Sequence, residues 1–210
     1  VKMRVGSGDG TLAHSVARVK AAREGLAENI DIMCDAHGTL SVAEAKRFCR
    51  EVAECNIGWL EEPVVADDKR GMAEVRASSD VPISTGESEF TRFAFRELAE
   101  LRACDIFQPD LSICGGITEA MRIEAIASAY QLRYAPHLWG GALTFAAGLQ
   151  TMVVASTGFI VEYSLGANPM LHELAVEDFT VVDGHLDVPD RPGLGVTVDE
   201  DFVEKYRVKN

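Results

Sequence analysis

Short apolar runs alternate with longer amphipathic segments along most of this chain. Three of these runs, IDIMC, NIGWL and VPIST, are each followed by an acid: Asp35, Glu61 and Glu87. The spacing is 26 residues in both intervals. Brief strands that alternate with helix-length segments are typical of repeated βα units. The pattern therefore predicts a parallel sheet with one polar residue at the end of each strand.

The same spacing continues on both sides of these acids. Asp110, His137 and Glu162 follow the next apolar runs, and Lys2 and Arg4 lie in an earlier run, VKMRVG. Parallel strands joined by right-handed crossovers bring their carboxyl ends to one face, where (β/α)₈ barrels build their active sites. We expect these side chains to meet at the mouth of a TIM-type barrel. The alternative is that acids recur at this spacing by chance, since the chain contains 33 of them.

Helical periodicity and capping residues predict the segments between the strands. Ser41 with Glu44 is a capping-box pattern, and Asp9 or Thr11 is the candidate cap of the first helix. The expected helices cover residues 11–25, 41–55, 68–79, 91–101, 118–130 and 143–156.

The βα pattern stops after the expected last strand, FIVEYS. Residues 179–188 instead predict two short strands around Asp183-Gly184, a strong type I′ turn signal. We expect a barrel over residues 1–165. The C-terminal segment 166–210 is expected to pack against something other than the helical ring, toward a capping domain.

Composition narrows the function classes. The formal charge is −13 and 47% of residues are hydrophobic, which argues against nucleic-acid and anionic-membrane surfaces. No apolar run reaches membrane length, and we expect a soluble, cytoplasmic protein. Five cysteines without a CxxC pair indicate buried, reduced thiols. Because Val1 falls inside a strand pattern, we expect the chain to be a piece of a longer protein.

The three acids Asp35, Glu61 and Glu87 predict a metal centre. Converging carboxylates repel one another without a cation, and an all-oxygen set suits Mg²⁺ or Mn²⁺ better than zinc. Glu62 is adjacent to Glu61, and neighbouring strand residues point to opposite faces. Only one of the two is expected to face the mouth.

Two histidines are the candidate proton-transfer groups. Asp110 and His137 end neighbouring strands, so the carboxylate can fix the imidazole tautomer and raise its basicity, giving a general base; a structural histidine is the alternative. His37 lies on the same side as Asp35 and is a candidate acid. Lys2 and Arg4 share a face and suit an anionic substrate, with the pKa of Lys2 lowered by Arg4; a solvated basic strand end is the alternative.

The motifs KMR, DAH, EEP, GE, QPD with CGG, PH and VEY, and PGLG in the tail, occur in order over nearly the whole chain. In this combination the chain resembles the barrel domain of the enolase superfamily, mandelate racemase subgroup. The resemblance implies a (β/α)₇β barrel that lacks, in this chain, its first strand and helix and an N-terminal α+β capping domain. It also implies Mg²⁺ ligands and an Asp–His dyad. Glu162 then holds the substrate carboxylate or enolate oxygen. The implied ligands are Asp35, Glu61 and Glu87, and the dyad is Asp110 with His137.

Arg4 departs from the family's Lys-x-Lys pattern and stays protonated, so racemisation with two bases loses one unless Lys2 or His37 replaces it. We therefore favour a lyase, an acid-sugar dehydratase. In this hypothesis His137 removes the α-proton of a sugar acid or other α-hydroxy carboxylate, giving an enediolate. His37, with Lys2 in reserve, protonates the departing hydroxyl, and the product is a 2-keto-3-deoxy acid.

Two alternatives stay open. An isomerase, acting as a racemase, epimerase or lactone cycloisomerase, would use the same metal and dyad, and a non-catalytic barrel is the third possibility. The resemblance further implies a homo-oligomer.

Overall fold

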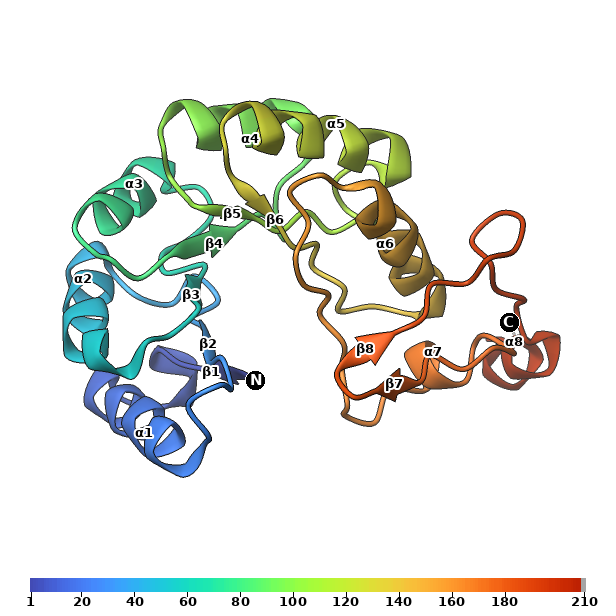
Figure 1. Ribbon diagram of the computed structural model, residues 1–210, viewed down its shortest axis with the longest axis horizontal. Coiled ribbons are helices and arrows are strands. Elements are labelled where there is room, and N and C mark those ends of the chain that lie inside the picture. Colours follow the sequence, from blue (N-terminus) through green and yellow to red (C-terminus); the bar gives the residue numbers. More distant parts are fainter. Residues whose placement is uncertain (209–210) are drawn as a thin grey trace.

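The computed structural model describes residues 1–208, and six short parallel strands form its central sheet in the order β1 to β6. In Figure 1 the strands line the inner side of an arc, and the helices that connect them lie outside it. The predicted α/β barrel architecture is confirmed. The strands are β1 (Lys2–Arg4), β2 (Met33–Asp35), β3 (Trp59–Glu61), β4 (Ile83–Thr85), β5 (Ile106–Phe107) and β6 (Arg133–Tyr134).

Parallel pairing sets the polar strand ends side by side. Arg4 pairs with Asp35, and Asp35 pairs with Glu61, in direct register. Asp110 and His137 form an isolated parallel bridge beyond the ends of β5 and β6. The register thus brings residues that are far apart in sequence to one edge of the sheet.

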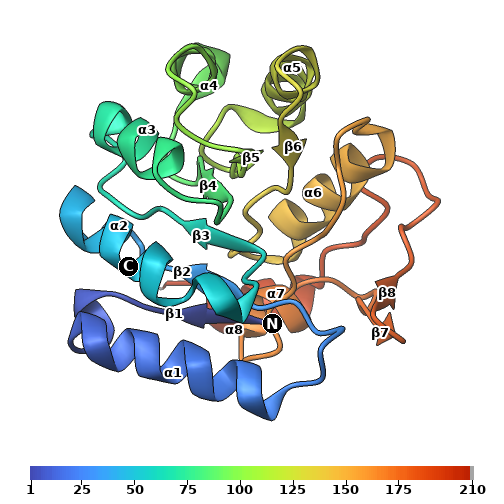
Figure 2. The ribbon, with the colours of Figure 1, turned by 60° about the vertical axis from the view of Figure 1, so that its left-hand side comes forward.

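The helices follow the expected segments closely. Thr11 caps α1 through a hydrogen bond from the His14 amide, and both halves of the Ser41–Glu44 capping box are present at α2. Figure 2 shows α1 to α5 on the outer side of the strands. The bounds are α1 (Leu12–Gly25), α2 (Val42–Glu51), α3 (Lys69–Ala77), α4 (Thr91–Glu100), α5 (Gly116–Ala129) and α6 (Ala142–Val154), with short 3₁₀ turns at Ser7–Asp9 and Ala53–Cys55.

The core lies between this helical layer and the sheet. Phe48, Phe95 and Phe107 are fully buried in it, and the Phe95 and Phe107 rings meet edge to face with centroids 5.0 Å apart. All five cysteines are buried and unpaired, as expected. No helix within residues 1–208 is both long enough and apolar enough to cross a membrane.

The prediction that FIVEYS forms the last strand of the barrel is wrong. Among the described residues, the one parallel bridge to the sheet in this region comes just before the segment, from Gly158 to Tyr134, and the Tyr134 amide donates to the Thr157 carbonyl. The Ala135 amide points the other way, to Phe107, so the next donor toward the segment would come from Pro136. Proline has no N–H group, and the ladder ends there.

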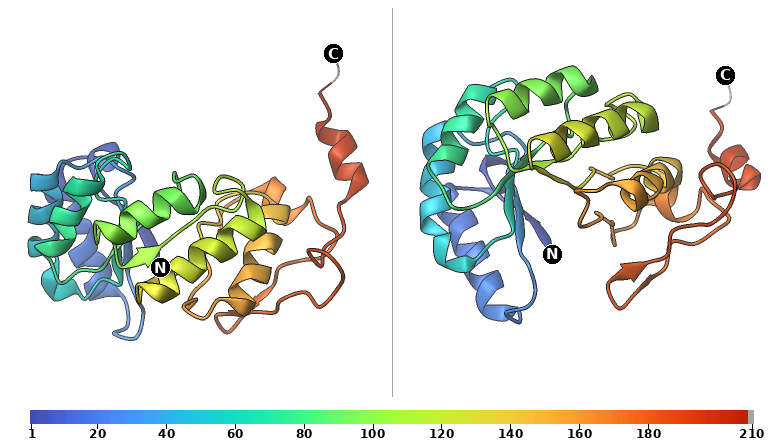
Figure 3. Two further views of the ribbon diagram at one scale, coloured as in Figure 1. Left: turned by 90° about the horizontal axis from the view of Figure 1, so that it is seen from above. Right: turned by 45° about the horizontal axis from the view of Figure 1, so that its top comes forward.

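The C-terminal segment contains α7 (Pro169–His172), a hairpin of β7 (Val181–Val182) with β8 (His185–Leu186), and α8 (Glu200–Tyr206). Asp183 and Gly184 have φ of 50° and 77°, as the predicted type I′ turn requires. The segment extends beyond α6, with α8 at its far end (Figure 3).

Contrary to the expectation, part of this segment packs on the helical ring. The ring of Phe179 meets that of Phe145 on α6 with centroids 4.7 Å apart, and Gln150 on α6 donates to the Pro189 carbonyl. The expectation was wrong because the segment is rich in polar turn residues. The few apolar residues that pack on α6 form no recognisable pattern in its sequence. Contact with a capping domain stays a prediction.

Candidate active site

A cavity of about 380 Å³ opens at the carboxyl ends of the strands. Its lining includes seven of the nine side chains that the sequence singles out, together with Met3 and Trp139. The seven are Lys2, Arg4, Asp35, His37, Glu87, His137 and Glu162. The other two, Glu61 and Asp110, are 1% and 2% exposed and contact members of this set.

Glu61 is held from two sides. Lys2 Nζ lies 2.9 Å from Glu61 Oε1, and the indole nitrogen of Trp59 donates to Glu61 Oε2 at 2.9 Å. Trp59 precedes Glu61 by two residues on β3, so both side chains lie on the inner face of the strand. Trp59 was not among the predicted site residues, although its two-residue spacing from Glu61 was the available signal.

The acids at the mouth carry an electrostatic cost that a cation would relieve. Burial, together with the neighbouring carboxylate of Glu61, raises the pKa of Asp35 above its ordinary value. Burial also raises the pKa of Glu87, and Glu61 and Asp35 add to it, against the opposing effect of His137. Oxygen donors under mutual repulsion suit a hard divalent cation such as Mg²⁺. Among the described residues, however, the ligand atoms of Asp35, Glu61 and Glu87 do not all lie within 4.8 Å of one another.

The Asp110–His137 pair has the expected geometry. His137 Nδ1 lies 2.8 Å from Asp110 Oδ2, while the backbone amide of Ser112 donates to Asp110 Oδ1 at 2.7 Å. Burial alone would raise the pKa of Asp110 and lower that of His137. Hydrogen bonds from His137 and Ser112 outweigh burial at Asp110 and lower its pKa. At His137, the hydrogen bond to Asp110 and the negative charges of Glu87 and Glu162 outweigh burial and raise its pKa.

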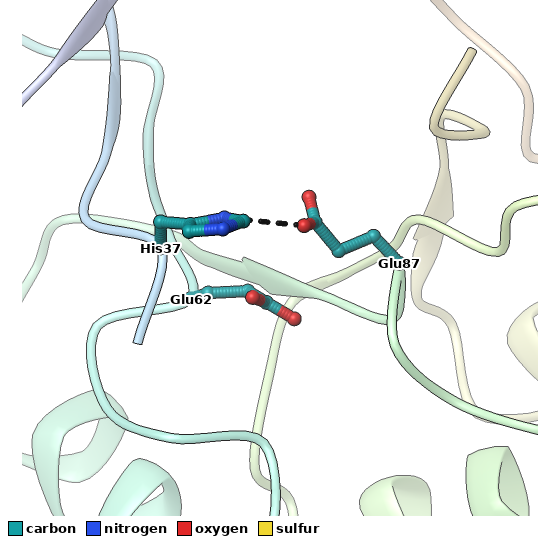
Figure 4. A group of neighbouring side chains, drawn as sticks. All are labelled: His37, Glu62 and Glu87. Atoms are coloured by element: carbon teal, nitrogen blue, oxygen red, sulfur yellow. Dashed lines mark ion pairs between the residues drawn. The ribbon is translucent and has the colours of Figure 1, made fainter. Parts of the chain in front are cut away.

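The two histidines each contact a different carboxylate oxygen of Glu87. His37 Nδ1 lies 3.3 Å from Glu87 Oε1, and His137 Nε2 lies 3.5 Å from Glu87 Oε2. The His37–Glu87 contact is the dashed line in Figure 4. His37 sits in the loop after β2, where its amide donates to Asp35 Oδ1 at 2.9 Å.

The ionic partners and the pKa of Lys2 differ from those predicted. Its Nζ lies 2.5 Å from Glu162 Oε1 as well as beside Glu61, whereas Arg4 Nε lies 3.9 Å from Asp35. Burial would lower the pKa of Lys2, but the two carboxylates outweigh burial and raise that pKa above its ordinary value. The prediction failed because it considered Arg4 alone and not the acids across the mouth.

Glu62 also departs from the expectation that only one of the adjacent glutamates faces the mouth. β3 ends at Glu61, and Glu62 has a φ of 38°, so strand alternation no longer sets its direction. An oxygen of Glu62 lies within 4.8 Å of ligand atoms of His37 and Glu87. Figure 4 shows the three side chains beside one another. Burial raises the pKa of Glu62 to about 8, and Glu87, Glu61 and Asp35 add to this effect.

Residues 1–202 match the model of the family described as Enolase C-terminal domain-like. The chain belongs to this family. The resemblance and the barrel fold inferred from the sequence are thereby confirmed.

Several relatives have known names. The chain is 34% identical to a D-galactonate dehydratase of Xanthomonas oryzae pv. oryzae over 91% of its length, and 31% identical to a D-galactarolactone cycloisomerase of Agrobacterium fabrum over 99%. Among solved structures it is similar to the 3,6-anhydro-D-galactonate cycloisomerase of Zobellia galactanivorans. That similarity has a TM-score of 0.93 and 31% identity, and covers 99% of this chain and 58% of that one. The chain covers 52% and 56% of the two curated relatives, about half their length.

Proposed function

We propose that the protein of which this chain is part is an acid-sugar dehydratase. It removes the α-proton of a sugar-acid carboxylate and eliminates the β-hydroxyl as water, giving a 2-keto-3-deoxy acid. The observation that carries the proposal is the position of Glu87 between two imidazoles, one at each carboxylate oxygen. A substrate bound beside Glu87 would have one proton-transfer group on either side.

Asp35, Glu61 and Glu87 are the residues that would hold a magnesium ion. The raised pKa values of Asp35 and Glu87 support a cation at this position. The ion supplies positive charge that stabilises the negative charge developing on the substrate carboxylate when the α-proton leaves. Trp59 and Lys2 restrict the orientation of Glu61, as outer partners of a metal ligand commonly do.

His137 is the proposed base. When its Nδ1–H group donates to Asp110, Nε2 carries the free electron pair and faces the cavity side of Glu87. Nε2 then accepts the α-proton. His37, half exposed at the opposite side, donates a proton to the departing hydroxyl, which leaves as water. The resulting enol gains a proton at C3 as it converts to the keto acid.

Lys2 and Glu162 are proposed to orient the carboxylate end of the substrate. The raised pKa keeps Lys2 protonated at neutral pH, so it acts through its charge and not as a reserve acid. Lys2 in turn lowers the pKa of Glu162, against burial, and Glu162 accepts from the Leu138 amide at 3.2 Å. Arg4, with a side chain 59% exposed, adds positive charge at the entrance.

A lactone cycloisomerase is the second candidate, favoured by the relatives of that name. It requires the base and the metal but no loss of water, so the role of His37 distinguishes the two reactions. A small-molecule acid sugar is the partner in either case, and oligomeric assembly and cytoplasmic location stay predictions.

The test is to incubate the full-length protein in D₂O with Mg²⁺ and a library of acid sugars and their lactones. We expect 2-keto acid from at least one sugar acid, its loss in His137→Asn, and in His37→Asn retention of α-proton exchange with loss of elimination. His14→Asn, an exposed histidine on α1, is the matched control. Lactone isomerisation without any keto acid would replace the dehydratase by the cycloisomerase, and activity retained in His137→Asn would reject both.

A further inference from the structure

Glu62 carries a buried oxygen that the proposed reaction does not use. The residue is 4% exposed, and its Oε1 has no hydrogen-bond partner among the described residues. Buried polar atoms in native proteins almost always have a partner, and an unpaired one costs free energy. The Glu62 side chain lies beside those of His37 and Glu87 (Figure 4), so a ligand placed among the three would lie next to this carboxyl group.

The backbone holds Glu62 in this position. Its amide donates to the Ser84 carbonyl at 2.9 Å, and its carbonyl accepts from the Gly38 amide at 2.7 Å. Gly38 follows His37 directly, so the loop that carries the imidazole is tied to the residue that carries the carboxyl group. His37 and Glu62 therefore keep a fixed relation.

The spacing of the three groups suits a metal ion. One ligand atom from each of His37, Glu62 and Glu87 lies within 4.8 Å of the other two, and His37 Nδ1 is 3.3 Å from Glu87 Oε1. Two ligands bound at about 2.0 to 2.1 Å in a tetrahedral geometry lie about 3.3 Å apart. One edge of the coordination shell is already at this distance.

The donor set differs from that of the three strand-end acids. An imidazole nitrogen with carboxylate oxygens is a combination that Zn²⁺ and neighbouring transition ions accept, whereas Mg²⁺ prefers oxygen alone. We propose that His37, Glu62 and Glu87 form a second divalent-cation site at the mouth, selective for Zn²⁺-type ions over Mg²⁺.

Filling this site has a regulatory consequence. The ion would engage the nitrogen of His37 and an oxygen of Glu87, one group that the proposed elimination needs as an acid and one that the magnesium site needs as a ligand. Zn²⁺ would therefore inhibit the enzyme. The binding of the ion itself is independent of which reaction the protein catalyses.

The test compares binding of two ions to two variants by calorimetry, using the full-length protein. We expect Glu62→Gln to weaken Zn²⁺ binding by at least about tenfold, the loss that follows removal of even an outer partner of a metal, and to leave Mg²⁺ binding unchanged. Asp35→Asn should do the reverse. Glu124→Gln, a buried glutamate on α5 that accepts from Ser156, is the matched control and should change neither.

A second measurement guards against misfolding of the Glu62 variant. Co²⁺ bound to the wild-type protein should give an absorption spectrum that His37→Asn alters, with thermal melting used to verify that each variant is folded. If Glu62→Gln and Asp35→Asn weaken both ions alike, only one cation site exists and the proposal is overturned. Unchanged Zn²⁺ affinity in a folded Glu62→Gln variant overturns it as well.

Discussion

At the residue scale, the mouth shows how short-range contacts decide what each acid does. Asp110 and Glu87 both lie beside His137, yet the pKa of Asp110 is lowered and that of Glu87 is raised. The difference arises because Asp110 accepts hydrogen bonds from Ser112 and His137, whereas Glu87 faces further carboxylates. One is therefore suited to fix an imidazole, and the other to receive a cation.

Asp110→Asn tests the first of these roles through the pH profile. Asp110 helps to raise the pKa of His137. A base with a raised pKa stays protonated up to a higher pH, and a protonated base cannot accept the α-proton. Removing the carboxylate lowers that pKa, so the rising limb of kcat/KM should move to lower pH. The limiting rate should fall about a hundredfold or more, because a general base contributes about 10² to 10⁴. Steady-state kinetics from pH 5 to 9, roughly the range over which histidines titrate, measure both.

Ser112→Ala is the comparison variant, because it removes a hydrogen bond to Asp110 and keeps the carboxylate. It should shift the limb less than Asp110→Asn. A limb that moves to higher pH in Asp110→Asn would show that Asp110 does not stabilise the imidazolium.

At the element scale, the sequence predicted the positions of the site residues better than their directions. The strand-end pattern placed Asp35 and Glu61 on neighbouring strands, and parallel register put them side by side. Side-chain direction at Glu62 and the partners of Lys2 depended on contacts between distant segments and on a left-handed backbone angle. Alternation along a strand cannot supply either, because it applies only within the strand.

Ser41→Ala tests whether local capping stabilises the helix that follows the His37 loop. Ser41 accepts from the Glu44 amide, and Glu44 accepts from the Ser41 amide at 2.9 Å. Loss of the serine oxygen should reduce the free energy of unfolding of the full-length protein by about 1 kcal/mol in urea titrations. Ser41→Asn keeps a capping oxygen and should recover most of this loss. Equal destabilisation by both substitutions would assign the effect to packing around Ser41.

At the scale of the whole molecule, the repeated βα units could be predicted from the sequence. The point in the chain at which the last strand of the sheet ends could not. Each repeat contains its own apolar strand and its own amphipathic helix, so local periodicity is sufficient to recognise it. The strand expected at FIVEYS depended on a donor from a neighbouring element, and Pro136 removes that donor. The C-terminal segment likewise depends on a few apolar anchors, of which Phe179 against Phe145 is one.

Phe179→Ala should separate this segment from the barrel. Phe179 is 9% exposed, its ring packs on Phe145, and its carbonyl accepts from the Tyr163 hydroxyl at 2.8 Å. Truncating a buried phenylalanine costs about 3 to 5 kcal/mol. If the loss is local, amides after residue 176 should exchange hydrogen much faster, while those of β1 to β4 keep their protection.

Hydrogen exchange followed by mass spectrometry distinguishes a local from a global effect. Phe93→Ala, at a side chain 56% exposed on α4, is the matched control and should leave both regions unchanged. Faster exchange throughout the barrel would mean that segment and barrel unfold as one unit. Because Tyr163 adjoins Glu162, loss of the anchor should also loosen Glu162 and its contact with Lys2. A higher KM for the substrate with an unchanged kcat is the expected kinetic sign of that loosening, since Lys2 and Glu162 are proposed to act on substrate binding and not on proton transfer.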